Sequence, residues 1–507
     1  MNLSKKTSIT LLILIILLQL IFRIYIGTKK EYFHMDEAYS YGLMNYDKLS
    51  IVDNSDFLNT WHNKEYYLDY FEVNSKEAKN IGAVFENQKN DVHPPLYYLL
   101  LRISASFTID NFTKWTGLAL NMIIFAVSSV FVYLLSKKIF KKDIYALLVT
   151  LVNGFTLISL DSAMYIRMYE LANLMVLITC YLHINLLDKP NLSFKNLLPL
   201  GIILILGGLT HYYFFVFAIG LYLIFSARWI KNKEYKNWIK YTVAIIISAV
   251  IYLLIWPYAI NHILFGYRGV GANEGKLEAF TNNLNTYLFS ILNRGIFNYL
   301  IVLVILAVWL CCIKREKRNV TEKTNISLLL GLPIIIYLLL VALNSPYIEI
   351  RYIIPIYSIT TITYAYLVKQ IIEKYWDDKH TLYITSAILL IVLVSPLVTR
   401  TKLEMTYTKY NNIAQKVKES NMPIIYVFNT DNNRFLDDVY LFTLAEKSIV
   451  LDNKTEYINT LKNEKENFIL ICNEGTDGDK IKENLSDKDI EYVQRMNACD
   501  IYFIYNK

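Results

Sequence analysis

Long apolar runs separated by short polar segments recur along the chain up to residue 398. Many of them approach the roughly 20 residues that an α-helix needs to cross a bilayer. The pattern predicts about eleven membrane-spanning helices, at residues 9–27, 116–136, 143–160, 168–187, 197–210, 211–228, 239–258, 294–313, 326–343, 351–370 and 381–398. One further apolar run, residues 94–107, is shorter and opens with Pro94 and Pro95. We predict a re-entrant or interface-lying helix there.

The positions of Lys and Arg predict how these helices cross the membrane, because cytoplasmic loops are enriched in positive charge. If the N-terminus is cytoplasmic and 94–107 is not a span, the basic clusters all fall in cytoplasmic loops. They occur at residues 137–142, 189–195, 228–240, 314–318 and 369–379. Counting 94–107 as a span would invert every later loop. We therefore predict an odd number of spans across the cytoplasmic membrane, with the N-terminus in the cytoplasm and the C-terminal tail outside.

The polar segments predict a second domain after the membrane region. Residues 1–399 are expected to form a transmembrane domain with two long outer loops, 28–115 and 259–293. The second loop contains glycines at 266–271, so it is either a lid over the acceptor or a flexible connector. From residue 400 the composition changes, and strand-like runs at 424–428, 448–451, 468–472 and 501–505 alternate with polar helical stretches. We predict a small extracytoplasmic α/β domain over residues 400–507.

Composition agrees with a membrane protein. Of the 507 residues, 54% are hydrophobic, and the mean hydropathy is +0.31, which is unusual for a soluble chain. The net charge of +7 is less informative than the placement of the charges, and we expect membrane lipid, not nucleic acid, as a partner. Five cysteines are too few for a disulfide framework. Cys472 and Cys499 in the tail are either one disulfide or two unpaired thiols.

Two adjacent carboxylates, Asp36 and Glu37, follow the first hydrophobic run. Charge near lipid is costly and like charges repel, so the pair requires an explanation. One explanation is structural, since acidic residues favour the first turn of a helix. The other is catalytic, since a carboxylate can act as a general base toward a hydroxyl group.

The predicted topology brings further polar residues to the same outer side of the membrane. They are Asp91, His93, Arg167, Tyr169, His211, Arg351 and Tyr352. Arg and His are suited to binding a phosphate. Each also has a structural alternative: a turn at His93, arginines that extend to lipid headgroups, and a buried imidazole at His211. Arg23, near the outer end of the first helix, is expected to extend to headgroups or to pair with an acid. A base facing a phosphate-binding cluster fits transfer from a phosphate-linked donor.

The order and spacing of these motifs resemble a known family. They comprise the acidic pair, His93-Pro94-Pro95-Leu96-Tyr97-Tyr98, Tyr165-Ile166-Arg167-Met168-Tyr169, Thr210-His211-Tyr212 and Arg351-Tyr352-Ile353-Ile354-Pro355. This set is similar to the polyprenyl-phosphate-dependent glycosyltransferases of the GT-C fold. The similar branch is the family-39-like one, with protein O-mannosyltransferases and the lipid A aminoarabinose transferases. The resemblance covers roughly residues 10–400.

The resemblance implies inverting transfer of one sugar from a polyprenyl phosphate to a lipid, glycan or protein acceptor. Asp36 would be the general base and Glu37 its companion, while the other seven residues would bind the donor phosphate or the substrate. It implies no cofactor. A divalent cation held by Asp36, Glu37, Asp91 and His93 is a less favoured alternative. The competing functions are a flippase or transporter of lipid-linked sugars, which requires ionisable residues within the membrane, and a non-catalytic scaffold.

Overall fold

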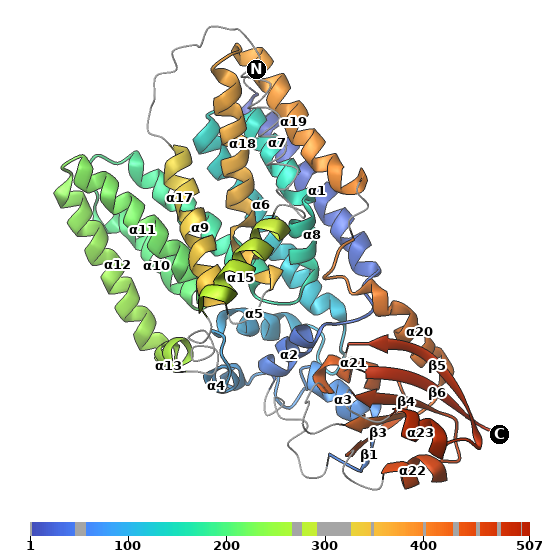
Figure 1. The fold of residues 1–507 in the computed structure, drawn as a ribbon. Coiled ribbons are helices and arrows are strands. Elements are labelled where there is room, and N and C mark those ends of the chain that lie inside the picture. Colours follow the sequence, from blue (N-terminus) through green and yellow to red (C-terminus); the bar gives the residue numbers. More distant parts are fainter. Residues whose placement is uncertain are drawn as a thin grey trace. The chain divides into compact units, whose positions relative to one another are not determined.

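A computed structural model describes residues 3–45, 57–265, 276–291, 326–345, 349–398, 402–428, 435–452, 457–473, 478–497 and 499–507 (Figure 1). Internal contacts divide the chain into two compact units. The helical unit comprises Met1–Tyr25, Gln88–Tyr97 and Leu118–Leu403. The α/β unit comprises Ile26–Asn87, Tyr98–Gly117 and Glu404–Lys507. Most of the predicted outer loop 28–115 thus groups with the tail and not with the predicted transmembrane domain.

The chain is mainly α-helical and polytopic, as predicted. The long helices are α1 (Lys5–Thr28), α6 (Lys114–Phe140), α9 (Tyr169–Leu187), α11 (Tyr213–Lys231) and α12 (Tyr235–Ile255). Within the described residues, these five are long and apolar enough to cross a membrane. A sixth span forms if α7 (Asp143–Phe155) and α8 (Leu157–Met164), which are bent by 58°, are counted together. The number eleven is therefore not confirmed, and the predicted span 294–313 lies outside the described residues.

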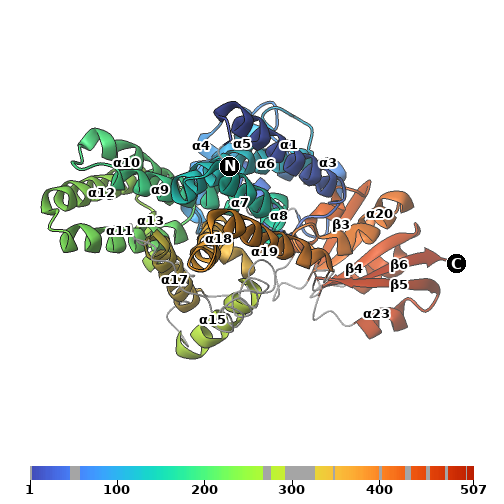
Figure 2. The same cartoon turned by 90° about the horizontal axis from the view of Figure 1, so that it is seen from above.

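The helical unit contains further described helices. They are α10 (Phe194–Gly208), α13 (Ala259–Leu264), α15 (Lys276–Ile291), α17 (Ile326–Asn344), the 3-10 helix η2 (Ile350–Ile356), α18 (Tyr357–Glu373) and α19 (Asp378–Val398). Helices α10, α11 and α12 pack together as one group (Figure 2). The glycines at 266–271 lie outside the described residues, so the lid stays a prediction.

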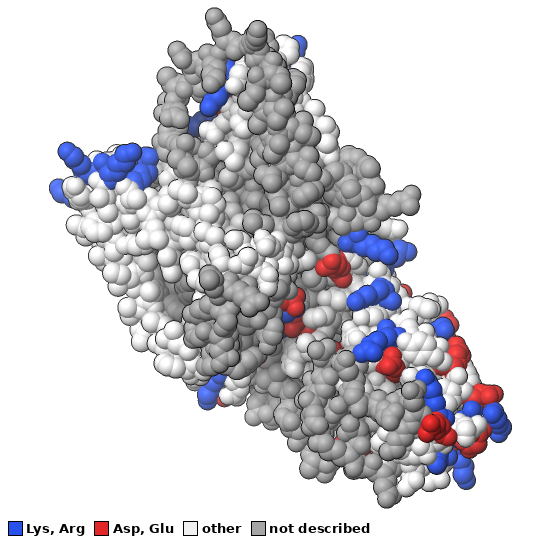
Figure 3. All heavy atoms as spheres, viewed as in Figure 1, with Lys and Arg blue, Asp and Glu red and all other residues white. Residues whose placement is uncertain are grey.

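The surface charge of the helical unit follows the predicted pattern. On the face shown in Figure 3, Lys and Arg gather where α11 ends and α12 begins, and the visible sides of these helices are uncharged. Large apolar side chains such as Ile246 and Leu254 are exposed along α12, which a lipid environment accounts for. The orientation of the helices in the membrane stays a prediction.

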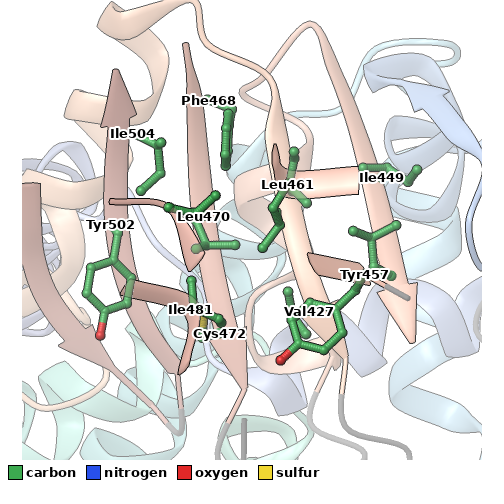
Figure 4. Packing of buried hydrophobic residues seen from close by; sticks show 13 residues of the cluster. Val427, Ile449, Tyr457, Leu461, Phe468, Leu470, Cys472, Ile481, Tyr502 and Ile504 are labelled. Atoms are coloured by element: carbon green, nitrogen blue, oxygen red, sulfur yellow. The ribbon is translucent and has the colours of Figure 1, made fainter. Parts of the chain in front are cut away.

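A mixed six-stranded sheet forms the core of the α/β unit, in the order β1-β3-β2-β4-β6-β5. Four strands match the predicted runs: β2 (Ile424–Phe428), β3 (Lys447–Asp452), β4 (Phe468–Asn473) and β6 (Cys499–Asn506). The central strands β3, β2 and β4 are parallel. Phe468 and Leu470, at alternate positions of β4, point to one face, which Leu461 of α22 (Tyr457–Asn463) and Ile481 of α23 (Gly478–Asn484) cover (Figure 4).

The first outer loop is folded and contributes to this sheet. It contains α2 (Met35–Met44), β1 (Trp61–Asn63), α3 (Lys64–Phe71), α4 (Gly82–Asn90) and α5 (Leu96–Ala105). Strand β1 pairs antiparallel with β3, with Trp61 opposite Ile449. The other unpredicted strand, β5 (Lys488–Met496), pairs with β6. The tail also contains α20 (Asn411–Ser420) and α21 (Val439–Phe442).

The two tail cysteines are free thiols. Cys472 and Cys499 lie on neighbouring antiparallel strands, but Cys472 is opposite Asp500, and Cys499 is opposite Asn473. Both side chains are buried and unpaired. The alternative of two unpaired thiols is therefore confirmed.

A buried carboxyl group makes the stability of the α/β unit depend on pH. Asp438 accepts hydrogen bonds from Tyr32 at 3.4 Å and from Asn497 at 3.1 Å. Burial raises the pKa of Asp438 to about 7. The folded state therefore binds the proton of Asp438 more tightly than the unfolded state, so the contribution of this group to stability is fully present below pH 4 and is lost as pH rises through 7.

We expect Asp438→Asn to remove this loss, on the order of 3 kcal/mol between pH 5 and pH 8, because the amide carries no charge. Thermal unfolding of the purified protein at pH 5 and pH 8 would measure it. The control is Asp489→Asn, an exposed carboxylate of β5. Equal pH dependence in wild type and Asp438→Asn would show that Asp438 does not titrate in this range.

Candidate active site

The acidic pair lies in the first turn of α2, and Glu37 takes part in capping that helix. His34 is the N-cap residue, and its Nδ1 accepts a hydrogen bond from the Asp36 amide at 3.1 Å. Glu37 Oε2 accepts a hydrogen bond from the His34 amide at 2.9 Å. This capping box satisfies amide groups that the first turn leaves without helical partners. The structural explanation therefore applies to Glu37.

Glu37 also forms a buried ion pair with Lys30. Lys30 Nζ lies 2.9 Å from Glu37 Oε2, and both side chains are 0% exposed. Lys30 donates a second hydrogen bond to the Met405 carbonyl at 2.8 Å. The Asp36 side chain is 10% exposed and lies 3.6 Å from His34 Nδ1. The two adjacent carboxylates thus differ, because Glu37 is held in the interior of the α/β unit whereas Asp36 keeps contact with solvent.

In the helical unit, Asp91 and His93 form a close pair before α5. Asp91 Oδ2 lies 2.6 Å from His93 Nδ1. Burial alone would raise the pKa of Asp91, but the charges of His93 and Arg167 lower it to about 2. Asp91 is therefore ionised at neutral pH and orients the His93 ring. The Leu96 amide donates a hydrogen bond to the Leu209 carbonyl at 2.9 Å, which ties this turn to the segment before His211.

Arg167 lies in the turn between α8 and α9, and this turn is held by several hydrogen bonds. The Arg167 amide donates to the Tyr165 carbonyl at 2.7 Å. Asn121 Nδ2 donates to the same carbonyl at 2.6 Å. Arg351 Nη1 donates to the Tyr165 hydroxyl at 3.1 Å, and Arg351 also pairs with Glu349 at 3.6 Å. Tyr165 thus connects the turn that carries Arg167 with the start of η2.

A row of aromatic rings extends from this turn. Tyr165 stacks on Tyr169 with 5.9 Å between ring centroids, and His211 follows at 5.4 Å from Tyr169. Tyr213 lies 5.1 Å from His211 and 5.3 Å from Tyr352. The row therefore joins the starts of α9 and α11 with η2.

Of the nine predicted site residues, seven belong to the helical unit and are linked there by the contacts above. They are Asp91, His93, Arg167, Tyr169, His211, Arg351 and Tyr352. Asp36 and Glu37 belong to the α/β unit. The predicted site residues did not include Tyr165, Tyr213 or Lys30, and only Tyr165 carried a signal, through its place in the motif around Arg167.

The α/β unit supplies a carboxylate whose side chain is 10% exposed, and the helical unit supplies cations with aromatic rings. Across the residues that the structure describes, no group of three or more His, Cys, Asp or Glu side chains is placed to hold a metal ion. The cations can hold an anion such as phosphate, and the carboxylate can accept a proton.

The chain is similar to one protein family and to two solved structures. Residues 92–257 match the family described as dolichyl-phosphate-mannose-protein mannosyltransferase. A similar solved structure is ArnT from Cupriavidus metallidurans bound to undecaprenyl phosphate, with 9% identity, a TM-score of 0.50, and coverage of 99% of this chain and 98% of that chain. Its apo form matches with 9% identity, a TM-score of 0.47, and coverage of 88% and 94%. No curated protein sequence matches the chain. The resemblance predicted from the motifs is confirmed.

Proposed function

We propose that this chain, a membrane glycosyltransferase of the GT-C class, transfers a sugar from a polyprenyl-phosphate-linked donor to an acceptor on the outer face of the cytoplasmic membrane. Asp36 takes the proton from the acceptor hydroxyl while the oxygen of that hydroxyl attacks the anomeric carbon of the donor sugar. The bond from that carbon to the phosphate oxygen breaks, and the configuration is inverted. The released polyprenyl phosphate gains negative charge, which Arg167, Arg351 and His93 stabilise.

The observation that carries this proposal is the cluster of cations in the helical unit. His93 and Arg167 fall within the segment that matches the mannosyltransferase family, and Tyr165 joins Arg167 to Arg351. ArnT, whose fold is similar, binds undecaprenyl phosphate. The difference in exposure between Asp36 and Glu37 supports Asp36 as the group that meets the acceptor, with Glu37 in a positioning role.

The direct test is donor consumption by the purified protein in lipid nanodiscs. A panel of undecaprenyl-phosphate sugars would be incubated with cell-envelope extract, and mass spectrometry would follow undecaprenyl phosphate and glycosylated acceptor. We expect both products with at least one donor, in the presence of EDTA, since the proposed reaction uses no metal. Activity lost to EDTA and restored by Mn²⁺ would contradict the metal-free mechanism, and no consumption of any donor would contradict the proposal. Cell-surface glycans missing from a deletion strain would identify the sugar.

A second candidate is a flippase or transporter of lipid-linked sugars. It is favoured by two features of the helical unit: the buried ionisable residues Arg23 and Glu170, and the bend between α7 and α8. Flipping of a labelled lipid-linked sugar in proteoliposomes that contain no acceptor would support the transporter. Transfer that requires an acceptor would support the enzyme.

A further inference from the structure

Two oppositely charged residues are fully buried in the helical unit, outside the cluster described above. Arg23 of α1 and Glu170 of α9 are both 0% exposed and interact electrostatically. The surrounding surface of α1 is apolar, with Leu14, Leu18 and Ile21 exposed. Charges buried in a membrane segment are expensive and are usually retained for a function.

Arg23 satisfies backbone carbonyls at the bend between α7 and α8. Its Nη2 donates to the Gly154 carbonyl at 2.8 Å and to the Ser159 hydroxyl at 2.7 Å. The guanidinium also lies over the ring of Phe125, at 3.3 Å from its centroid. A bent helix within lipid frees carbonyls that only protein groups can satisfy. Arg23 therefore stabilises the position of α8 against α7.

Glu170 accepts hydrogen bonds from one side chain of α8 and one side chain of α18. Its carboxylate accepts from the Ser162 hydroxyl at 2.5 Å and from the Tyr357 hydroxyl at 3.3 Å. The Tyr357 hydroxyl lies 3.3 Å from that of Ser159, which Arg23 contacts. Hydrogen bonds thus run from Arg23 through Ser159 and Tyr357 to Glu170, and join α1, α8, α9 and α18.

This network joins the two helix ends on either side of the turn that carries Arg167. Helix α8 ends at Met164 and α9 begins at Tyr169, so Ser162 and Glu170 lie on opposite sides of the turn. The Ser162–Glu170 hydrogen bond joins these two sides directly. A shift of either helix would therefore move Arg167.

Stability alone does not account for the network, because apolar residues of similar volume often replace buried charged residues without loss. Fixed geometry does account for it, since phosphate binding needs side chains held in place before the ligand arrives. We propose that the Arg23–Glu170 network positions Arg167 for the donor phosphate, and that Glu170 is a positioning residue of the transfer reaction. This proposal rests on the proposed function.

The test compares Glu170→Gln and Tyr357→Phe with a matched control in the same helix. Asn173 is also buried in α9, and neither atom of its amide has a hydrogen-bond partner among the described residues, so Asn173→Leu removes a polar group outside the network. Binding of undecaprenyl phosphate, KM for the donor, kcat and Tm would be measured for each purified protein. We expect Glu170→Gln to weaken lipid binding and raise KM by roughly 10- to 100-fold, with a smaller change in kcat. Tyr357→Phe should act in the same direction, and Asn173→Leu should match wild type.

The outcomes separate this proposal from the proposed function. If wild type binds undecaprenyl phosphate and Glu170→Gln and Tyr357→Phe bind it equally well, the positioning role is wrong and the enzyme function stands. If wild type does not bind the lipid, the proposed function fails and the positioning role fails with it. If Glu170→Gln does not fold, Tyr357→Phe decides, because it keeps both charged residues and removes one hydroxyl. A lower Tm with unchanged KM would show a purely structural role and would overturn the proposal.

Discussion

We expect Asp36→Asn to reduce sugar transfer by about 10²- to 10⁴-fold, which is the usual contribution of a general base. The amide keeps the size of the carboxylate but cannot accept the acceptor proton. Folding should change little, because loss of one negative charge from the first turn of a helix costs about 0.3–1 kcal/mol. The measurement is kcat with a fixed lipid-linked donor, together with Tm.

The neighbouring carboxylate provides the matched comparison. Glu37→Gln retains an oxygen that can accept the hydrogen bond from the His34 amide, but it leaves Lys30 buried without its charged partner. We expect this variant to lose stability, whereas Asp36→Asn should lose activity at nearly unchanged Tm. Full activity in Asp36→Asn would show that another group takes the proton. Loss of Tm in both variants would show that the pair is only structural.

The four buried strands of the tail could be predicted because each is a short apolar run bounded by polar residues. Ile424–Phe428 was predicted with its observed bounds, since all five side chains are buried. Strand β5 was missed because only two of its nine side chains are buried, so it contains no continuous apolar run. Strand β1 was missed because it has three residues and its pairing with β3 is a long-range contact.

In the candidate site too, some residues could be predicted from the sequence, whereas the contacts that hold them could not. Arg167, His211 and Arg351 could be predicted because polar residues at the ends of apolar runs stand out in the sequence. The partners that hold them could not, since contacts such as Arg351 with Tyr165 join residues far apart in the chain. Lys30 carried no signal, because its partners are Glu37 and a carbonyl of the tail. Exposure, which distinguishes Asp36 from Glu37, requires the folded structure.

We expect Lys30→Met to destabilise the α/β unit by about 3–5 kcal/mol, the usual cost of removing one partner from a buried ion pair. Methionine fills much of the space of the lysine stem, so the loss comes mainly from the charge left on Glu37. The Met405 carbonyl also loses the hydrogen bond that ties the first outer loop to the tail. Thermal unfolding of the purified protein would measure the effect.

The double variant Lys30→Met/Glu37→Gln separates the charge from the packing. With both charges removed, no ion remains unpaired, and we expect it to recover most of the stability lost in Lys30→Met. Lys29→Met is the control, because the Lys29 side chain is exposed and its loss should leave Tm unchanged. If the double variant is no more stable than Lys30→Met, the loss comes from packing and from the Met405 hydrogen bond. The contact between the first outer loop and the tail would then stabilise the α/β unit, and the unpaired charge on Glu37 would contribute little to the loss of stability.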